Sequence, residues 1–136
     1  MNKAMLVNDD VNVCDRTATM LTALGWDVFV VEPNDLLNDL SKLQVPQLVL
    51  VDIEMRNGVG FDLLLKARRR FQDAFIVAAT RGSDRDLWPG LVDMCGADRY
   101  LVGPVSKTKL GQQIDVAVAR GQLDESMTWT PASTGC

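Results

Sequence analysis

Five short apolar runs alternate along this chain with five segments in which apolar residues recur at intervals of three and four. Among these runs, Leu48–Val51 is apolar at every position, which is typical of a strand buried on both faces of a parallel sheet. Strands that alternate with helices predict one parallel sheet covered by helices on both faces, with right-handed crossovers. The sequence therefore predicts an α/β fold, with strands expected at Lys3–Val7, Trp26–Val31, Leu48–Val51, Phe75–Ala79 and Arg99–Val102.

Helices are expected between these strands and after the last one. In the fourth helix, Pro89 predicts either a late start, with the proline in the first turn, or a kink, because an interior proline clashes with the preceding turn. In the third, Arg68, Arg69 and Arg70 occupy the last turns, where cations complement the helix dipole, and we interpret them as a solvated helix end. The expected helices are Val11–Leu24, Leu36–Leu43 capped by Asn34, Phe61–Phe71, Asp84–Cys95, and a last one capped by Ser106 and ended by Gly121.

Composition and patterning restrict the cellular setting. One domain is expected over residues 1–121, and residues 122–136, which have no apolar period, are expected to be a disordered tail or a truncated linker. The net charge of −4 argues against a non-specific nucleic-acid surface. No run approaches the roughly 18 apolar residues of a membrane span, and polar residues from Asn8 onward interrupt any secretory signal. Three scattered cysteines fit a reducing compartment, so a cytoplasmic protein is expected.

Three carboxylates follow the first and third predicted strands: Asp9, Asp10 and Asp52. If these two strands are neighbours, as in the strand order 2-1-3-4-5, the carboxylates share the crevice at the switch point of the sheet. A cluster of oxygen ligands suits Mg²⁺, and a carboxylate can act as a nucleophile towards phosphorus. Thr80 ends the fourth strand and offers a hydroxyl there. The simpler interpretations are helix capping by Asp9 or Asp10, a loop position for Asp52, and a bond from Thr80 to a strand-end backbone group.

Five features in this order and spacing resemble a response regulator receiver domain of the single-domain CheY type, over residues 3–121. They are the pair Asp9-Asp10, the segment Asp52–Met55 with Gly60, Thr80 after strand four, and the segment Gly96–Pro104 around strand five. The resemblance implies a flavodoxin-like, doubly wound (βα)5 fold with a five-stranded parallel sheet of order 2-1-3-4-5.

By this resemblance, Asp52 accepts a phosphoryl group from a sensor histidine kinase or a phosphotransfer protein. Mg²⁺ is held by Asp9, Asp10, Asp52 and the backbone carbonyl of Glu54. Thr80 and Tyr100 form the switch pair, and the face made by helix four, strand five and helix five binds an unidentified downstream protein. Such a chain is a signalling module with at most slow autodephosphorylation, rather than an enzyme.

Three positions depart from the family pattern. Arg56 stands where the family has a proline after Met, and Arg81 stands where it has a small residue after the switch threonine. Gly103 replaces the lysine expected directly before Pro104, which leaves charge on the phosphoryl oxygens uncompensated. Lys107 lies in the next helix, so we expect Arg56 or Arg81 to supply the positive charge, although an arginine fork is not equivalent to an ammonium.

The alternative function is a phosphorylation-independent pseudo-receiver that serves as an interaction or dimerisation module, and Gly103 favours it. Direct nucleic-acid binding requires an output domain absent from this chain. Mg²⁺-dependent phosphatases also use an aspartyl nucleophile, but their Asp-x-Asp pattern is missing because position 54 is Glu. Trp88 suits either core packing or a partner contact, Tyr100 either sheet packing or the switch, and Cys14 and Cys95 fit small core positions.

Overall fold

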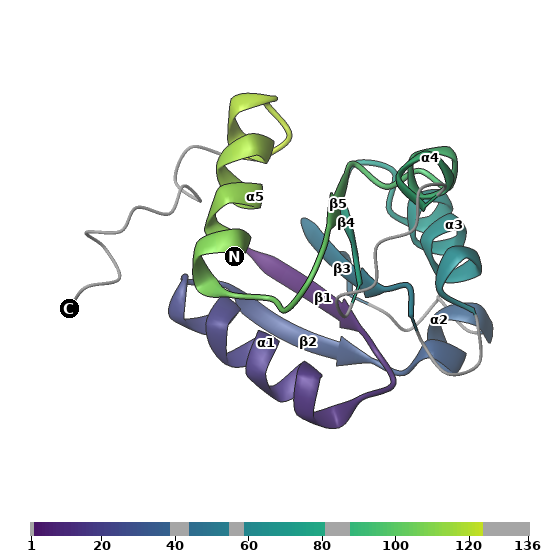
Figure 1. Cartoon of the computed structure of the whole chain (residues 1–136), viewed down its shortest axis with the longest axis horizontal. Helices are drawn as coiled ribbons and strands as arrows, with labels where there is room; N and C mark the ends of the chain where they lie inside the picture. The colour runs from purple at the N-terminus through teal and green to yellow at the C-terminus, as the bar shows by residue number, and fades with distance from the viewer. Residues whose placement is uncertain (1, 39–43, 55–58, 81–87, 124–136) are drawn as a thin grey trace.

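The computed structural model describes residues 2–38, 44–54, 59–80 and 88–123 of the chain. Within these ranges, five strands form one parallel sheet in the order β2-β1-β3-β4-β5 (Figure 1). The strands are β1 (Lys3–Val7), β2 (Asp27–Val31), β3 (Leu48–Asp52), β4 (Phe75–Ala79) and β5 (Arg99–Leu101). The predicted α/β class and strand order are therefore confirmed.

The register brings the functional strand ends to one edge. Val7 of β1 lies opposite both Val31 of β2 and Val51 of β3, so these three strands end side by side. Asp52 pairs with Ala79 of β4 and is the last residue of β3, one residue later than the predicted strand end. The backbone of Asp52 is thus paired within the sheet, which fixes the point from which its carboxylate projects.

Five helices form layers on the two faces of the sheet (Figure 1). On one face, α1 and α5 pack against the sheet through a cluster that includes Leu21 and Ile114. On the other, α3 and α4 pack through a cluster that includes Leu63, Leu64 and Val92, and α2 lies beside α3. The helices are α1 (Val11–Ala23), α2 (Pro33–Asn38), α3 (Gly60–Arg70), α4 (Trp88–Met94) and α5 (Lys107–Ala119).

The continuous apolar run of β3 serves both cores, as its pattern predicts. Val49 and Val51 belong to the cluster on the α3 face, whereas Leu48 and Leu50 belong to the cluster on the α1 and α5 face. All five residues of β3 are buried. Successive side chains of a strand point to opposite faces, so a strand that is covered on both sides is apolar at successive positions, as Leu48–Val51 is.

Two predicted helix starts differ from the observed ones, those of α2 and of α3, which begins at Gly60 rather than at Phe61. Helix α2 begins at Pro33, one residue before the expected cap Asn34, because proline suits the first turn of a helix. The described part of α4 runs from Trp88 to Met94 and contains Pro89, and because the residues before Trp88 are not described, a late start with the proline in the first turn remains a prediction. Residues 39–43 and 84–87 of the second and fourth predicted helices lie outside the described residues.

The interpretation of Arg68 as part of a solvated helix end is wrong. Arg68 is half-buried and donates to three backbone carbonyls, those of Gly96 (2.7 Å), Gln72 (2.8 Å) and Ala74 (3.0 Å), and to a carboxylate oxygen of Asp98 (2.7 Å). Its neighbours in sequence, Arg69 and Arg70, are exposed as expected. One arginine of the three therefore anchors the amino end of β4 and β5.

The chain beyond α5 packs on the domain for two further residues. The Gln122 side-chain amide donates to Asp98 Oδ1 (3.1 Å), and Leu123 is buried in the cluster on the α5 face. Residues 124–136 lie outside the described residues, so the domain boundary placed after residue 121 remains a prediction. Across the described residues, none of the helices has the length and apolar character needed to span a bilayer.

Candidate functional site

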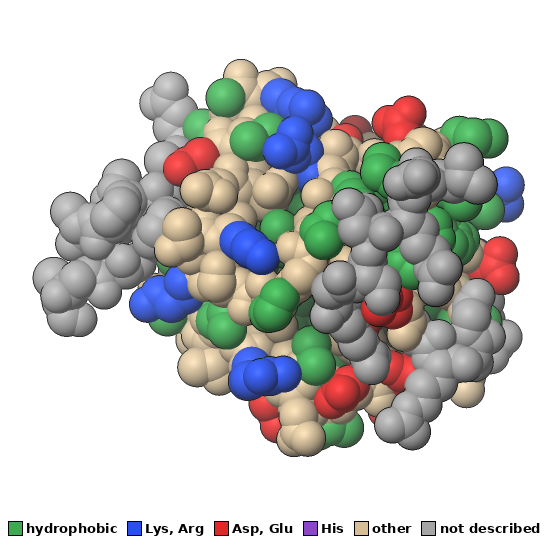
Figure 2. All heavy atoms as spheres, viewed as in Figure 1, with side chains coloured by type: hydrophobic (Ala, Val, Ile, Leu, Met, Phe, Trp, Pro, Cys, Tyr) green, Lys and Arg blue, Asp and Glu red, His purple; other side chains and the backbone are tan. Residues whose placement is uncertain are grey.

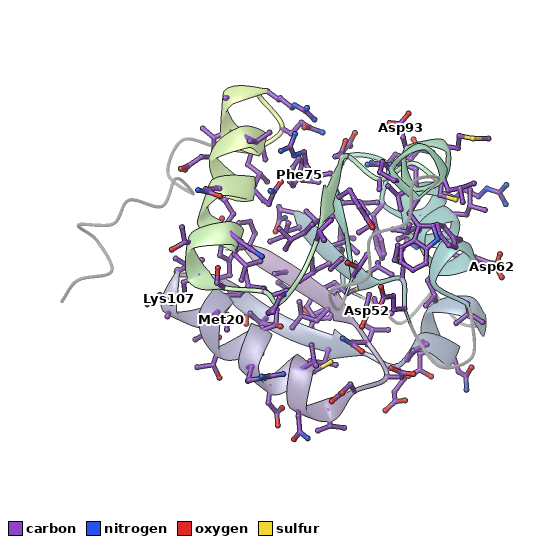
Figure 3. All side chains as sticks on the ribbon, viewed as in Figure 1. Met20, Asp52, Asp62, Phe75, Asp93 and Lys107 are labelled. Carbon is purple, nitrogen blue, oxygen red and sulfur yellow. The ribbon has the colours of Figure 1, made fainter. Side chains whose placement is uncertain are left out.

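Asp52 is a nearly buried carboxylate at the carboxyl end of β3, with 5% of its surface exposed. Its Oδ1 accepts a hydrogen bond from the Glu54 amide (2.7 Å), and the intervening Ile53 amide donates to the Ala79 carbonyl (3.0 Å). Gly60 starts α3 against the backbone of Ile53; a Cβ on Gly60 would stand 2.6 Å from the Ile53 carbonyl oxygen. These contacts hold the backbone on which the carboxylate stands; Figure 3 labels Asp52.

Asp10 caps α1, which confirms for this residue the simpler interpretation of the acidic pair as a helix cap. Its Oδ1 accepts from the amides of Asn12 (3.0 Å) and Val13 (3.2 Å), which satisfies two of the four free N–H groups at the helix start. The Asp10 amide in turn donates to Asn8 Oδ1 (3.0 Å). Asp9 is exposed. The cap holds the Asp10 side chain at the start of α1, directly after the loop that follows β1.

The electrostatics of Cys14 place the acidic residues in one neighbourhood. Burial raises the pKa of the Cys14 thiol, and the negative charges of Asp15, Asp10, Asp52 and Asp9 raise it further, in that order. The thiol also donates to the Asn8 carbonyl (3.8 Å between Sγ and O). Figure 2 shows acidic side chains gathering near the edge where β1 and β3 end. These four carboxylates therefore lie near the Cys14 thiol.

Within the described ranges, no three Asp, Glu, Cys or His side chains gather closely enough to hold a metal ion. The ligand set expected from the sequence also includes a backbone carbonyl, that of Glu54, and joins Asp9 or Asp10 on one strand to Asp52 on the next. The metal assignment to Asp9, Asp10, Asp52 and Glu54 thus remains a prediction. The described donors are oxygens only, which is the chemistry that Mg²⁺ requires.

Thr80 directly follows β4, and 3% of its surface is exposed. Its amide donates to the Leu101 carbonyl (3.0 Å), but its Oγ1 is buried without a hydrogen-bond partner in the part of the chain that the structure describes. A buried hydroxyl without a partner is costly and is open to a ligand atom. Tyr100 is half-buried on β5 opposite Ala78 and packs against the cluster on the α3 face. The role of Thr80 and Tyr100 as a switch pair remains a prediction.

The ammonium group of Lys109, which was not among the predicted residues, lies beside Gly103. Lys109 Nζ donates to the carbonyls of Val102 (3.0 Å) and Pro104 (3.2 Å) and stands 3.2 Å from the place a Cβ on Gly103 would take. Gly103 itself has a φ of +86°, a conformation that favours glycine. The predicted cap at Ser106 could have indicated this position. It places Lys109 in the first turn of α5, and helical side chains lean towards the N-terminus, which here means towards Gly103.

A cavity of about 320 Å³ opens between α1, the strand ends and the loop from β5 to α5. Its wall is mainly apolar, but it includes Asp52, Thr80, Cys14 and the backbone at Gly103. Figure 3 labels Asp52 and Met20, which line it from β3 and α1 respectively. Nothing in the sequence pattern predicts this cavity, because its size depends on how the loop and α1 pack.

Of three other residues singled out in the sequence, the structure describes only Trp88. Arg56 and Arg81, expected to supply positive charge, lie outside the described residues. Trp88 begins α4, is half-buried, and meets the ring of Phe61 edge-on with the centroids 6.3 Å apart. Core packing therefore accounts for part of the Trp88 surface.

Comparison with known proteins identifies what the chain is similar to. A family model described as the response regulator receiver domain matches residues 4–115. The transcriptional regulatory protein CpxR of Klebsiella pneumoniae is 31% identical over 134 residues, which cover 98% of this chain and 56% of that protein. The chain thus spans about half the length of the curated relatives it matches.

Solved structures share the fold. A response regulator from Burkholderia pseudomallei, with a phosphorylated aspartic acid, a calcium ion and citrate, has a TM-score of 0.76 at 19% identity, over 90% of this chain and 71% of that one. The response regulator TrrA from Thermotoga maritima, in complex with Mg²⁺ and BeF, has a TM-score of 0.69 at 22% identity, over 90% of this chain and 100% of that one.

Proposed function

This chain belongs to the response regulator receiver domain family, and we propose that it is a two-component phosphoacceptor switch whose acceptor is Asp52. The observation that carries the proposal is the placement of Asp52. Its carboxylate stands at the carboxyl end of a central parallel strand, is 5% exposed, and is oriented by the Glu54 amide. Ligands of doubly wound sheets bind at this edge, beside the switch point between β1 and β3.

The proposed reaction is transfer of a phosphoryl group from a phosphohistidine. A carboxylate oxygen of Asp52 attacks phosphorus, the new P–O bond forms as the P–N bond breaks, and the donor imidazole leaves with the bonding electron pair. The product is an aspartyl phosphate. Negative charge spreads over the phosphoryl oxygens during transfer, so the site needs hydrogen-bond donors and cations around them.

One hydroxyl and three positively charged side chains of this chain suit that requirement. The Thr80 hydroxyl is buried beside Asp52 and lacks a partner among the described residues, so it is free to donate to a phosphoryl oxygen. Positive charge is proposed to come from Arg56 or Arg81, since Gly103 has no side chain. Lys109, whose ammonium lies next to Gly103, is a third source of positive charge near this loop.

Asp9, Asp10, Asp52 and the Glu54 carbonyl are the residues we propose to hold Mg²⁺. When bound, this ion neutralises the adjoining carboxylates and stabilises charge on the phosphoryl oxygens. The oxygen donors, and the position of Asp9, Asp10 and Asp52 close enough to act on the Cys14 thiol, fit such an ion. The Burkholderia and Thermotoga structures, which hold Ca²⁺ and Mg²⁺ respectively, support a divalent cation as a ligand of this fold.

The output is proposed to pass from Thr80 to Tyr100 and then to the face made by α4, β5 and α5. On α4, Leu91 and Met94 are 40% and 80% exposed, and apolar side chains of this size at a surface suit a protein partner. A sensor histidine kinase or phosphotransfer protein is the proposed donor, and a downstream protein is the proposed target. We assign the receiver role to residues 1–121 of a cytoplasmic protein, and a DNA-binding output needs a further domain.

Intact mass after incubation with acetyl phosphate and Mg²⁺ tests the phosphoacceptor role. The wild type should gain one phosphate, and Asp52→Asn should gain none, because the amide lacks the nucleophilic oxygen but keeps the shape of the side chain. Omitting Mg²⁺ should abolish labelling of the wild type. Labelling of Asp52→Asn to the same extent as the wild type would contradict the assignment.

Gly103 favours one second function, a pseudo-receiver that binds its partner without phosphorylation. The absence of a side chain there removes the cation that the family places on the phosphoryl oxygens. This alternative predicts no phosphate adduct under any donor, and equal partner or self-association for the wild type and Asp52→Asn in sedimentation measurements.

A further inference from the structure

The cavity between α1 and the loop before α5 has a mainly apolar wall. Leu6 of β1, Leu50 of β3 and Ala79 of β4 line it and belong to the cluster on the α1 and α5 face. Met20 of α1 and Val105 of the loop before α5 also line it and pack against the same cluster. With a volume of about 320 Å³, the cavity is about twice as large as an apolar cavity of about 150 Å³ that holds benzene. It therefore has the size and the wall of a site for a small apolar molecule.

The loop on one side of this cavity is held in place by Lys109. Its ammonium donates to the carbonyls of Val102 (3.0 Å) and Pro104 (3.2 Å), which stand on either side of Gly103. Gly103 and Pro104 line the cavity, and Gly103 has a φ of +86°, which favours glycine. Because these hydrogen bonds fix the loop, this part of the wall is formed before any ligand enters.

Charges of both signs surround the cavity. On its lining, Asp52 is negative and Arg16 is positive, and Arg16 is exposed to solvent. Lys109 adds a second positive charge beside Gly103. Asp52 already interacts within the protein, through the Glu54 amide among other contacts, so its charge is not used here to bind a ligand. An ion of either sign would give up its hydration to an apolar wall and would meet a like charge as well as an opposite one, so the site favours an uncharged ligand.

One hydroxyl on the lining suits a ligand of this kind. Thr80 is 3% exposed, and its Oγ1 has no hydrogen-bond partner among the residues that the structure describes. A hydroxyl both donates and accepts, and burial without a partner is unfavourable. An alcohol group on a ligand does both as well, so the two groups satisfy each other in either direction. The same Thr80 hydroxyl is proposed above to meet a phosphoryl oxygen, but the unphosphorylated protein offers it no such partner.

We propose that the cavity binds an uncharged alcohol with a compact apolar body, of the size of hexan-1-ol or benzyl alcohol. The body lies along Leu6, Leu50, Met20 and Val105, and the hydroxyl bonds to Thr80 Oγ1. Two observations carry the proposal together, the apolar wall of the cavity and the buried Thr80 hydroxyl. Binding needs neither a phosphodonor nor Mg²⁺, so its test is independent of the phosphoacceptor role.

A homologous series of alcohols tests the apolar wall. Propan-1-ol, butan-1-ol, pentan-1-ol and hexan-1-ol are titrated into the full chain without Mg²⁺ or a phosphodonor, and amide chemical shifts are followed. Each added methylene should lower the dissociation constant about fourfold, as expected for burial of one CH₂ group. The largest shifts should fall on the residues that line the cavity. No saturable shift with hexan-1-ol, or an affinity that does not grow with chain length, would overturn the site.

Charged analogues of the same length test the uncharged class. Hexylammonium and hexanoate should each bind about tenfold more weakly than hexan-1-ol at neutral pH and low ionic strength, because each must lose the hydration of its charge. Equal or tighter binding of hexylammonium would mean that the charge of Asp52 dominates the cavity. Equal or tighter binding of hexanoate would mean that Lys109 or Arg16 does. Either outcome overturns the ligand class.

Substitutions at Thr80 test the polar contact. Ethylbenzene has nearly the shape of benzyl alcohol but lacks its hydroxyl, as valine has the shape of threonine without the hydroxyl. Thr80→Val should lower the affinity for benzyl alcohol about fivefold and leave that for ethylbenzene nearly unchanged, since one hydrogen bond is lost. Thr80→Ser, which keeps the hydroxyl, should keep the wild-type ratio of the two affinities. The same ratio in Thr80→Val as in the wild type, or a ratio in Thr80→Ser that falls to that of Thr80→Val, would overturn the contact with Thr80.

Discussion

Arg68 of α3 and Asp98 before β5 form an ion pair, with 2.7 Å between Nη2 and Oδ2, at the edge of the sheet opposite to Asp52. Each partner also forms hydrogen bonds with the backbone. Arg68 donates to the carbonyls of Gly96 and Ala74, and Asp98 accepts from the Ile76 amide (2.8 Å). Because the pair is only partly exposed, removal of one partner leaves half-buried polar groups without their bonds.

Replacing Arg68 with alanine should lower the free energy of unfolding by about 2–4 kcal/mol, since several charge-assisted bonds are lost together. Urea denaturation followed by tryptophan fluorescence measures this loss. Arg69→Ala is the matched control at the next position of the same helix; Arg69 is exposed, so its removal should change stability by about 0.5 kcal/mol or less. Equal effects of the two substitutions would show that the network is not stabilising.

Gly96→Ala should destabilise the protein more than Gly121→Ala. Both glycines have positive φ, +93° and +74° respectively, so both substitutions carry backbone strain of about 1 kcal/mol. Only at Gly96 would the new Cβ also meet a side chain, 2.5 Å from Cγ and 2.8 Å from Cβ of Arg68, whereas nothing lies within 4 Å at Gly121. The difference in unfolding free energy between the two variants measures the steric part, and no difference would argue against the close packing of Arg68 on Gly96.

Asp10→Ala should cost about 1 kcal/mol of stability even without Mg²⁺, because the cap of α1 is lost. Asp9→Ala removes an exposed neighbour that is not the cap, so its loss in metal-free buffer should be clearly smaller. Both variants should bind Mg²⁺ more weakly than the wild type in a fluorescence titration. A stability loss for Asp10→Ala that appears only with Mg²⁺ present would mean that the cap contributes little.

Stability should fall at alkaline pH in a way that depends on Cys14. Burial and the nearby carboxylates of Asp15, Asp10, Asp52 and Asp9 raise the pKa of this thiol in the folded state. The unfolded chain then loses the proton first, so the contribution is complete below the ordinary thiol pKa of about 8.5 and is lost as pH rises through the raised value. Melting temperatures from pH 7 to 10 measure this slope. In Cys14→Ser, whose hydroxyl does not titrate there, the slope should be shallower.

Positive charge near Asp52 should control the rate of phosphorylation. Arg81→Ala should lower the rate of labelling by acetyl phosphate about tenfold if this residue supplies the cation that Gly103 lacks. Lys109→Met should lower it too if the ammonium beside Gly103 contributes, and comparison of the two variants separates these sources. Arg120→Ala, a charge change at the far end of α5, is the control for net charge. Unchanged labelling in both test variants would mean that neither cation acts.

The elements that were predictable from sequence are those set by short-range patterns. The run Leu48–Val51 identifies a strand covered on both faces, and Ser106 is the cap of α5 as expected from its position. These signals are local because they depend on side-chain period and on hydrogen bonds within one turn. The strand order followed from the family resemblance rather than from any local pattern.

Other features depend on contacts between distant residues and were not predictable. Arg68 looked like its exposed neighbours, since nothing local marks the carbonyls of Gly96 and Ala74 as its partners. The position of Lys109 beside Gly103 required the path of the loop before α5. The cavity beside Asp52 is a property of packing between α1 and that loop, which no residue pattern encodes.

The Arg68 network has a mechanical consequence for the whole domain. It ties the starts of β4 and β5 to the end of α3, so this edge of the sheet acts as a fixed base. At the opposite edge, β4 ends at Ala79, and both Ala79 and Thr80 line a cavity. Displacements should therefore grow along β4 and β5 from their anchored amino ends towards their carboxyl ends, which border the cavity. Amide hydrogen exchange along β4 should then be slowest at Ile76 and fastest near Thr80.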